Sequence, residues 1–162
     1  MTKLCFLKDD ERAIIPKKRK ESAGYEVYML PVDKRISIMP GETRLLDTGL
    51  KVAFDSDYVL LVKETGESGL DGLSIGAGVI YSGFRDRIMI PINNTSNSEI
   101  VFMPADKEKW FEDYLDEHYF SFGIGSKFLY TQDKAIGELL LVPVIDAEVE
   151  EVSREEFERF DS

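Results

Sequence analysis

The chain has 162 residues, 43% of them hydrophobic, and its 31 acidic and 20 basic residues give a net charge of −11. This length fits one domain with a sizeable core, and no apolar run approaches the roughly 20 residues that a bilayer span needs. Because the negative field repels phosphate backbones, we expect neither a nucleic-acid nor a membrane partner. Charges interrupt the only apolar patch near the N-terminus, unlike in a secretory signal, so we expect a cytoplasmic protein.

Metal and anion sites are restricted by the residue types present. One cysteine, Cys5, and one histidine, His118, exclude an internal disulfide and a Cys/His zinc site. Carboxylates that could bind magnesium remain. The basic run "PKKRK" at residues 16–20 has two interpretations, a solvated loop or a loop that faces a phosphate near a pocket.

Short β-rich segments alternate with turns that contain Gly, Pro or Asn. In chain order these segments are residues 35–39, 43–54, 58–64, 86–92, 99–103 and 137–145. Many short strands divided by such turns predict an all-β sandwich or barrel.

One segment has helical rather than strand periodicity. Residues 105–120 place an apolar stripe at helical spacing, which predicts an amphipathic helix inserted into the β fold. The stripe consists of Trp110, Phe111, Tyr114, Leu115, His118 and Tyr119. It either packs on the barrel or serves as the surface for a protein partner. The acidic tail, residues 147–162, is expected to be solvated or to contact another subunit.

Four separated segments together resemble, in order, the conserved segments of trimeric dUTPases. They are "SAGYEV" at 22–27, "IMPGETRLLDTGLKV" at 38–52, "GVIYSGFRDRIMIPINN" at 78–94 and "KAIGELLLVPV" at 134–144. The insertion resembles that of the branch found in phages of Gram-positive bacteria. The resemblance implies a dUTPase-like jelly-roll or β-clip barrel over residues 1–146 and a homotrimer whose active sites are shared between subunits. It also implies hydrolysis of dUTP to dUMP and pyrophosphate with Mg²⁺.

Several catalytic positions depart from the family pattern. Tyr81 stands where the family aspartate after "GVI" holds the attacking water, and a phenol with a pKa of about 10 is a poor general base. The alternative for Tyr81 is packing in the core beside Ile80. The phosphate-binding arginine of the family corresponds to Thr65 or Glu67, neither of which is basic. Glu138 replaces a glutamine, and the glycine-rich C-terminal lid has no counterpart.

Other positions keep the family pattern. Glu26 stands where the family has the acid linked to the metal, and Phe84 with Arg85 matches the element that packs on the deoxyribose. Residues 77–80 match the hairpin that reads the pyrimidine through its backbone. A buried core position for Phe84 and a surface ion pair for Arg85 are the alternatives. The predicted ligand-binding residues are Ser68, Gly69, Ala77, Gly78, Ile80, Tyr81, Phe84, Arg85 and Glu138.

We expect Ser68, Tyr81, Phe84 and Arg85 to lie in one cleft at a subunit boundary. The related dCTP deaminases would need a glutamate near Pro91, and proline excludes that reaction.

Three functional hypotheses follow. The favoured one is a catalytically degenerate dUTPase-like protein that binds and sequesters a nucleotide or nucleotide-derived signal, as a phage anti-defence protein would. The second is a divergent dUTP diphosphatase or related nucleotide hydrolase that uses Glu26, Glu67 or Glu138 with Mg²⁺. The third is a protein-interaction module that acts on a host or phage regulator through residues 105–120.

Overall fold

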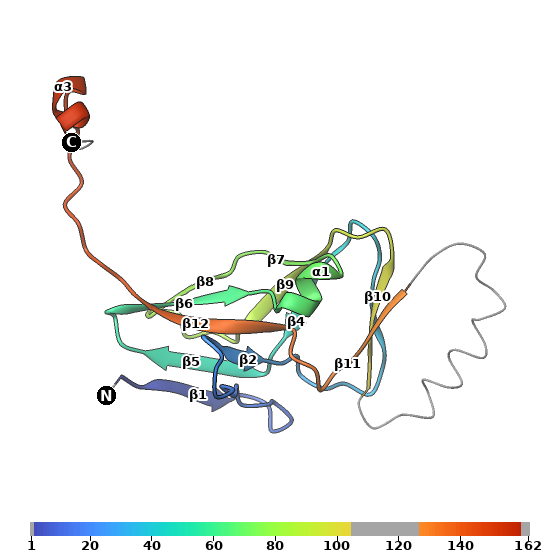
Figure 1. Cartoon of the computed structure of the whole chain (residues 1–162). Coiled ribbons are helices and arrows are strands. Elements are labelled where there is room, and N and C mark those ends of the chain that lie inside the picture. The colour runs from blue at the N-terminus through green and yellow to red at the C-terminus, as the bar shows by residue number, and fades with distance from the viewer. Residues whose placement is uncertain (1, 105–126, 160–162) are drawn as a thin grey trace.

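The computed structural model describes residues 2–104 and 127–159 of the chain. Figure 1 shows a β-rich body from which the C-terminal segment extends. The described strands are β1 (Leu4–Lys8), β2 (Tyr25–Val27), β3 (Ile36–Ile38), β4 (Thr43–Asp47), β5 (Leu50–Phe54), β6 (Tyr58–Lys63), β7 (Leu73–Ile75), β8 (Val79–Tyr81), β9 (Met89–Asn94), β10 (Glu99–Met103), β11 (Lys127–Thr131) and β12 (Gly137–Pro143). The described helices are α1 (Gly66–Leu70) and α3 (Arg154–Glu158). The predicted helix 105–120, which was to pack on the barrel or to serve as a partner surface, lies outside the described residues.

The strands form four small sheets, with the orders β1-β5, β11-β10-β3, β2-β12-β6-β8 and β4-β9-β7. All pairings are antiparallel except that of β10 with β11. The all-β prediction is therefore confirmed, and a strand lies in each segment predicted to hold one. The predicted segment 43–54 divides into β4 and β5 at Gly49, whose φ of 68° favours glycine.

The core is built from the inward faces of these sheets. On β9, Ile90 and Ile92 are buried while Met89 is exposed, which is the alternation expected of a strand covered on one face. A buried amide closes a gap between segments. Asn94 donates hydrogen bonds to the carbonyls of Ile38 (2.9 Å) and Ser98 (2.7 Å). Buried polar groups with partners of this kind fix the register of the chain around them.

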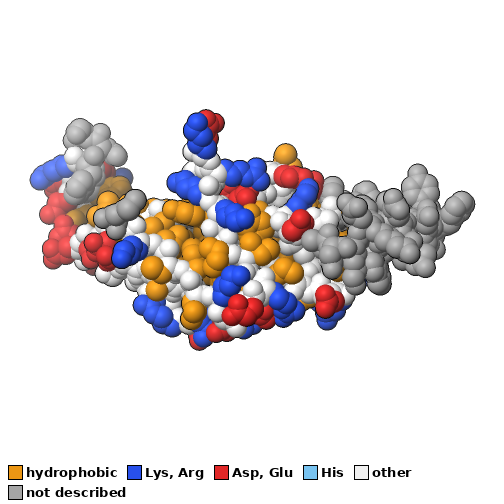
Figure 2. All heavy atoms as spheres, turned by 90° about the horizontal axis from the view of Figure 1, so that it is seen from below, with side chains coloured by type: hydrophobic (Ala, Val, Ile, Leu, Met, Phe, Trp, Pro, Cys, Tyr) orange, Lys and Arg blue, Asp and Glu red, His pale blue; other side chains and the backbone are white. Residues whose placement is uncertain are grey.

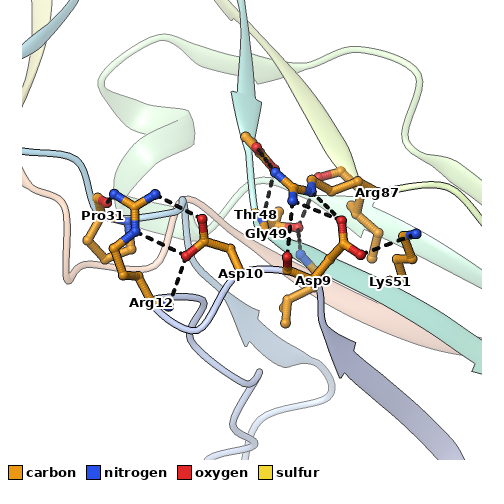
Figure 3. A network of polar contacts seen from close by, with 11 residues as sticks. Asp9, Asp10, Arg12, Pro31, Thr48, Gly49, Lys51 and Arg87 are labelled. Atoms are coloured by element: carbon orange, nitrogen blue, oxygen red, sulfur yellow. Dashed lines mark hydrogen bonds and ion pairs between the residues drawn. The ribbon is translucent and has the colours of Figure 1, made fainter.

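A cluster of charged residues ties the N-terminal strand to two loops of the body (Figure 3). Arg87, between β8 and β9, donates to Asp9 and to Asp47, both at 2.8 Å, and Lys51 lies 3.2 Å from the other oxygen of Asp9. We call Asp9, Asp47, Lys51 and Arg87 the Asp9–Arg87 cluster. Hydrogen bonds from Arg87 and then Lys51 lower the pKa of Asp9. The cluster contains two acids and two bases, so its charge is balanced.

The C-terminal segment leaves the body after β12 and ends in α3 (Figure 1). Ile145 and Val149 are 88% and 95% exposed. Ser153 begins α3 through a capping box with Glu156, so part of the acidic tail is helical. No helix among residues 2–104 and 127–159 is long and apolar enough to span a bilayer.

Candidate functional site

A cleft of about 410 Å³ opens beside the sheet β2-β12-β6-β8. It brings together five residues that the sequence singled out, Glu26, Thr65, Glu67, Ser68 and Glu138. The lining residues are Arg19, Ser22, Glu26, Tyr28, Thr65, Glu67, Ser68, Tyr130, Asp133, Lys134, Ala135 and Glu138. Four of these are acids and two are bases, so the cleft has an excess of negative charge.

Two carboxylates lie side by side in the cleft because of strand register. Glu26 on β2 is directly opposite Glu138 on β12 in an antiparallel pair. Residues in this relation have Cβ atoms about 4.5–5.5 Å apart, and like charges there repel. Lys63 is opposite Glu138 on the next strand, and Lys17 bridges to Glu26 on the other side. Two adjacent acids therefore lie between two lysine positions in a row across the sheet.

Polar neighbours hold both carboxylates in place. Arg19 places Nη2 2.5 Å from one oxygen of Glu26, and the Tyr28 hydroxyl donates to the other at 2.8 Å. Burial, followed by the bond to Glu26, raises the pKa of Tyr28 to about 12, so this phenol stays protonated near neutral pH. The Ser22 hydroxyl donates to Glu138 at 3.2 Å. Hydrogen bonds and one ion pair thus offset the repulsion between the two acids.

Helix α1 forms another wall of the cleft, where the sequence indicated a glycine-rich turn. Thr65 is its N-cap, and the Thr65 hydroxyl accepts from the Ser68 amide at 3.2 Å. The Ser68 hydroxyl donates to the Thr65 carbonyl at 3.2 Å and lies 3.1 Å from the Thr65 amide. Ser68, predicted to bind the ligand, is therefore engaged in closing the helix.

The end of α1 and the exposed side of the cleft are also fixed by polar contacts. Glu67 is 70% exposed and pairs with Lys134 at 3.5 Å. The hydroxyl of Tyr130 donates to Asp71, which caps α1 at its C-terminus. Burial and then this bond raise the pKa of Tyr130. Neither candidate position for the phosphate-binding arginine, Thr65 or Glu67, supplies a cation to the cleft.

Tyr81 lies on a different part of the chain surface. It belongs to β8, the edge strand of its sheet, and is 64% exposed, so the alternative of core packing beside Ile80 is wrong. Tyr81 is opposite Val59 on β6, whereas Glu138 is opposite Lys63. Four residues along a strand correspond to about 13 Å. Tyr81 and the cleft are consequently separated along the sheet within one chain.

The remaining predicted residues lie beside Tyr81. Phe84 packs partly buried against the core and meets the Tyr81 ring edge-on, with the centroids 6.2 Å apart. Arg85 is exposed and donates to the carbonyls of Ser82 (2.5 Å) and Phe84 (2.8 Å). It borders a separate hollow of about 220 Å³ formed with β1 and β5. Within one chain, therefore, Ser68 does not share a cleft with Tyr81, Phe84 and Arg85.

The predicted backbone-reading segment runs along the same edge strand. Ala77 has a left-handed backbone, with a φ of 47°. Gly78 accepts from the Val62 amide at 2.7 Å, and a Cβ at Gly78 would lie 2.6 Å from the Val62 carbonyl. Ile80 is buried, so only its backbone is available to a ligand. Among residues 2–104 and 127–159, β8 pairs with β6 alone, so it is the edge strand of its sheet.

The donor set does not fit a magnesium ion held by the protein alone. Among residues 2–104 and 127–159, no group of three acidic, histidine or cysteine side chains could hold a metal. Both oxygens of Glu26, the predicted metal-linked acid, already have partners in Arg19 and Tyr28. Magnesium prefers near-octahedral oxygen coordination and is often bound through substrate phosphates.

Sequence comparisons identify related proteins over part of the chain. The dUTPase family model matches residues 10–107. The deoxyuridine 5'-triphosphate nucleotidohydrolase of Cutibacterium acnes is 36% identical over 73 residues, or 43% of this chain and 48% of that protein. The enzyme of the same name from Psychrobacter is 28% identical over 90 residues, or 53% of this chain and 58% of that protein. The chain thus spans about half the length of these relatives.

Solved structures agree on the fold. A mutant dUTPase from phage phi11 of S. aureus aligns with a TM-score of 0.66 at 20% identity, covering 96% of this chain and 99% of that one. The EIAV dUTPase aligns with a TM-score of 0.63 at 17% identity, covering 94% and 98%. At such identities the likeness concerns the fold alone. Because the family model covers more than half of the sequence and the fold agrees with it, this chain belongs to the dUTPase family.

Proposed function

We propose that the chain binds a nucleotide and releases it chemically intact. The observation that carries this proposal is Tyr81, whose exposed phenol stands where the family pattern has its catalytic aspartate. A protonated phenol does not activate water well at neutral pH. The nucleotide would be sequestered rather than consumed. Phage dUTPases are among the structural neighbours. The proposal therefore includes an anti-defence role for the protein in a phage.

The charge of the cleft supports the same proposal. Family dUTPases need donors for three phosphates, but α1 presents Glu67 and β12 presents Glu138. Carboxylates accept hydrogen bonds and repel phosphate oxygens. Preorganised donors for the developing charge are usually a large part of phosphoryl-transfer catalysis. Their replacement by acids disfavours the transition state.

We further propose that the complete site needs more than one chain. The cleft and the Tyr81 surface are separate within a chain, and trimeric assembly would bring them together across a boundary. Exposed apolar strand residues, including Leu7, Leu45 and Met89, offer contact surface. Figure 2 shows apolar side chains gathered in the middle of one face between charged groups. Light scattering should give about three times the chain mass of 18.5 kDa, and a monomeric mass would contradict shared sites.

Nucleotide turnover tests the binding proposal directly. Protein would be incubated with dUTP and Mg²⁺ while pyrophosphate release is followed, alongside calorimetric binding of dUTP and dUMP. We expect binding with turnover far below about 1 s⁻¹, the low end for ordinary enzymes. Turnover near that value would overturn the proposal. Tyr81→Asp is the matched gain-of-function variant: restored turnover assigns the loss to this position, and continued inactivity assigns it also to the acids of the cleft.

Slow hydrolysis is the second candidate. The three acids named for a rearranged site, Glu26, Glu67 and Glu138, all line the same cleft. The names of the curated relatives describe hydrolysis of deoxyuridine triphosphate. If the wild-type protein turns over dUTP, Glu138→Gln should raise the rate when this acid only repels phosphate. The same variant should abolish turnover when Glu138 is the base.

A further inference from the structure

The basic loop 16–20 reaches the cleft through one side chain. Of its four cations, Arg19 lines the cleft. Lys18 instead lies over the Tyr25 ring, with Nζ 5.5 Å from the centroid. Lys17 is held by paired backbone hydrogen bonds with Glu26, which fixes the loop beside β2. Loop 16–20 thus contributes one guanidinium, that of Arg19, to the cleft from outside α1.

Arg19 is suited to exchange its partner. Its side chain is 78% exposed, and its ion pair with Glu26 is made through one nitrogen, Nη2. The guanidinium has five donors in a planar fork that fits phosphate oxygens. Glu26 would keep the hydrogen bond from Tyr28 if Arg19 moved, so its carboxylate would not be left unpaired. Such an exchange replaces one anion by another at the same cation.

The other cation of the cleft is less available. Lys134 faces Glu67 at 3.5 Å and also lies over the Tyr130 ring, 5.9 Å from its centroid. After Arg19 turned to a ligand, Asp133, Glu138 and Glu26 would remain as uncompensated negative neighbours. Each additional phosphate would add repulsion from these acids. The balance of charge fits one phosphate better than three.

We propose that Arg19 is the anion-binding residue of the cleft and that the preferred ligand class is a nucleoside monophosphate. This inference rests on the proposed nucleotide binding and specifies the ligand and the residue that meets its phosphate. It places the phosphate-binding cation on loop 16–20 instead of on the turn at α1.

The test compares deoxyuridine, dUMP and dUTP by calorimetry without Mg²⁺. The proteins are wild type, Arg19→Ala and Lys20→Ala, the last removing an equal charge from the same loop at a residue outside the cleft lining. We expect wild type to bind dUMP at least about tenfold more tightly than deoxyuridine, and dUTP no more tightly than dUMP. Arg19→Ala should abolish the gain from the phosphate while leaving deoxyuridine binding unchanged. Lys20→Ala should retain that gain, and melting curves confirm that each variant is folded.

The outcomes distinguish a failure of nucleotide binding from a failure of the role assigned to Arg19 or of the preference for a monophosphate. If wild type binds none of the three compounds, the proposed nucleotide binding fails, and the inference fails with it. If the compounds bind but Arg19→Ala keeps the preference for dUMP, only the role of Arg19 is overturned. If wild type binds dUTP at least about tenfold more tightly than dUMP, the monophosphate preference is overturned.

Discussion

The Asp9–Arg87 cluster and the cleft are both polar assemblies of segments distant in sequence, yet their charges are arranged differently. In the cluster, two acids meet two bases, and Arg87 bridges the carboxylate of Asp9, which follows β1, and that of Asp47 on β4 (Figure 3). In the cleft, four acids meet two bases, and strand register forces Glu26 against Glu138. A balanced cluster joins parts of a fold. An unbalanced one repels ligands of the same sign, and here the excess of acids limits how many phosphates a ligand can carry.

The largest effect on stability should come from disturbing the strands beneath the cleft. A Cβ at Gly137 would lie 2.8 Å from the Lys63 carbonyl and 2.9 Å from Ile75 Cδ1. Gly137→Ala should therefore destabilise the fold by about 1–3 kcal/mol, as overpacking does. Gly66→Ala in α1, where nothing lies within 4 Å, is the control. Chemical denaturation measures both, and equal stability of the two variants would show that the sheet yields.

Removing one arginine from each assembly tests whether the Asp9–Arg87 cluster stabilises the fold more than the cleft does. Arg87→Ala leaves Asp9 and Asp47 without their shared cation, so it should lower Tm by a few degrees. Arg19→Ala should leave Tm nearly unchanged because Glu26 keeps Tyr28 as a partner. Differential scanning calorimetry at low salt measures the Tm of both variants and of wild type. Similar shifts for both variants would remove the distinction between a structural and a binding arginine.

Acid should remove the contribution that the pair of Asp10 and Arg12 makes to stability. Hydrogen bonds from the Arg12 side chain and then its backbone lower the pKa of Asp10 to about 2, from 3.8. A carboxyl whose pKa is lower in the folded state stabilises the protein above the unfolded value, and this stabilisation disappears as the pH falls from about 4 to about 2. Melting curves over that range should show a steeper decline for wild type than for Asp10→Asn. Parallel declines would contradict a role for this pair.

The smallest effect is a change in the ionisation of one tyrosine in the cleft, Tyr28. The pKa of Tyr28, raised to about 12, exceeds the unfolded value of 10.0, so its contribution to stability is present below pH 10 and is lost as the pH rises toward 12. In a spectrophotometric titration, Tyr28→Phe should remove one phenol that ionises near pH 12. Tyr81→Phe is the control and should leave that ionisation in place. An unchanged high-pH phase in Tyr28→Phe would show that Glu26 does not hold this hydroxyl.

The sequence predicted the fold better than it predicted the site, for physical reasons. Alternating apolar residues, such as those of β9, report burial locally, so the all-β class and the strands within the predicted segments were predicted correctly, whereas β1, β2, β7 and β11 lie outside those segments. The capping box of α1 was missed because its acceptor and donor, Thr65 and Ser68, also suit a turn. The separation of Tyr81 from Glu138 depends on which residues face each other across β6, and register between strands is not contained in either strand alone.

The position of the basic loop was undecided for a similar reason. Its two interpretations were a solvated loop and a loop that faces a phosphate near a pocket, and the backbone bridge of Lys17 to Glu26 holds the loop where Arg19 lines the cleft. That bridge joins two segments separated by a turn. Charge runs in a sequence predict exposure, which Arg19 indeed has, but they do not predict the direction in which an exposed side chain points.

The capped helix α1 also determines how much a ligand must rearrange the protein. Thr65 and Ser68 close its first turn, and Tyr130 holds Asp71 at its end, so this wall keeps its shape before any ligand arrives. Binding against a wall that is already ordered loses little conformational entropy. The loss would fall mainly on the exposed side chain of Arg19. Because the rotation of one exposed side chain takes nanoseconds or less, association should be limited by diffusional encounter and not by the folding of a loop.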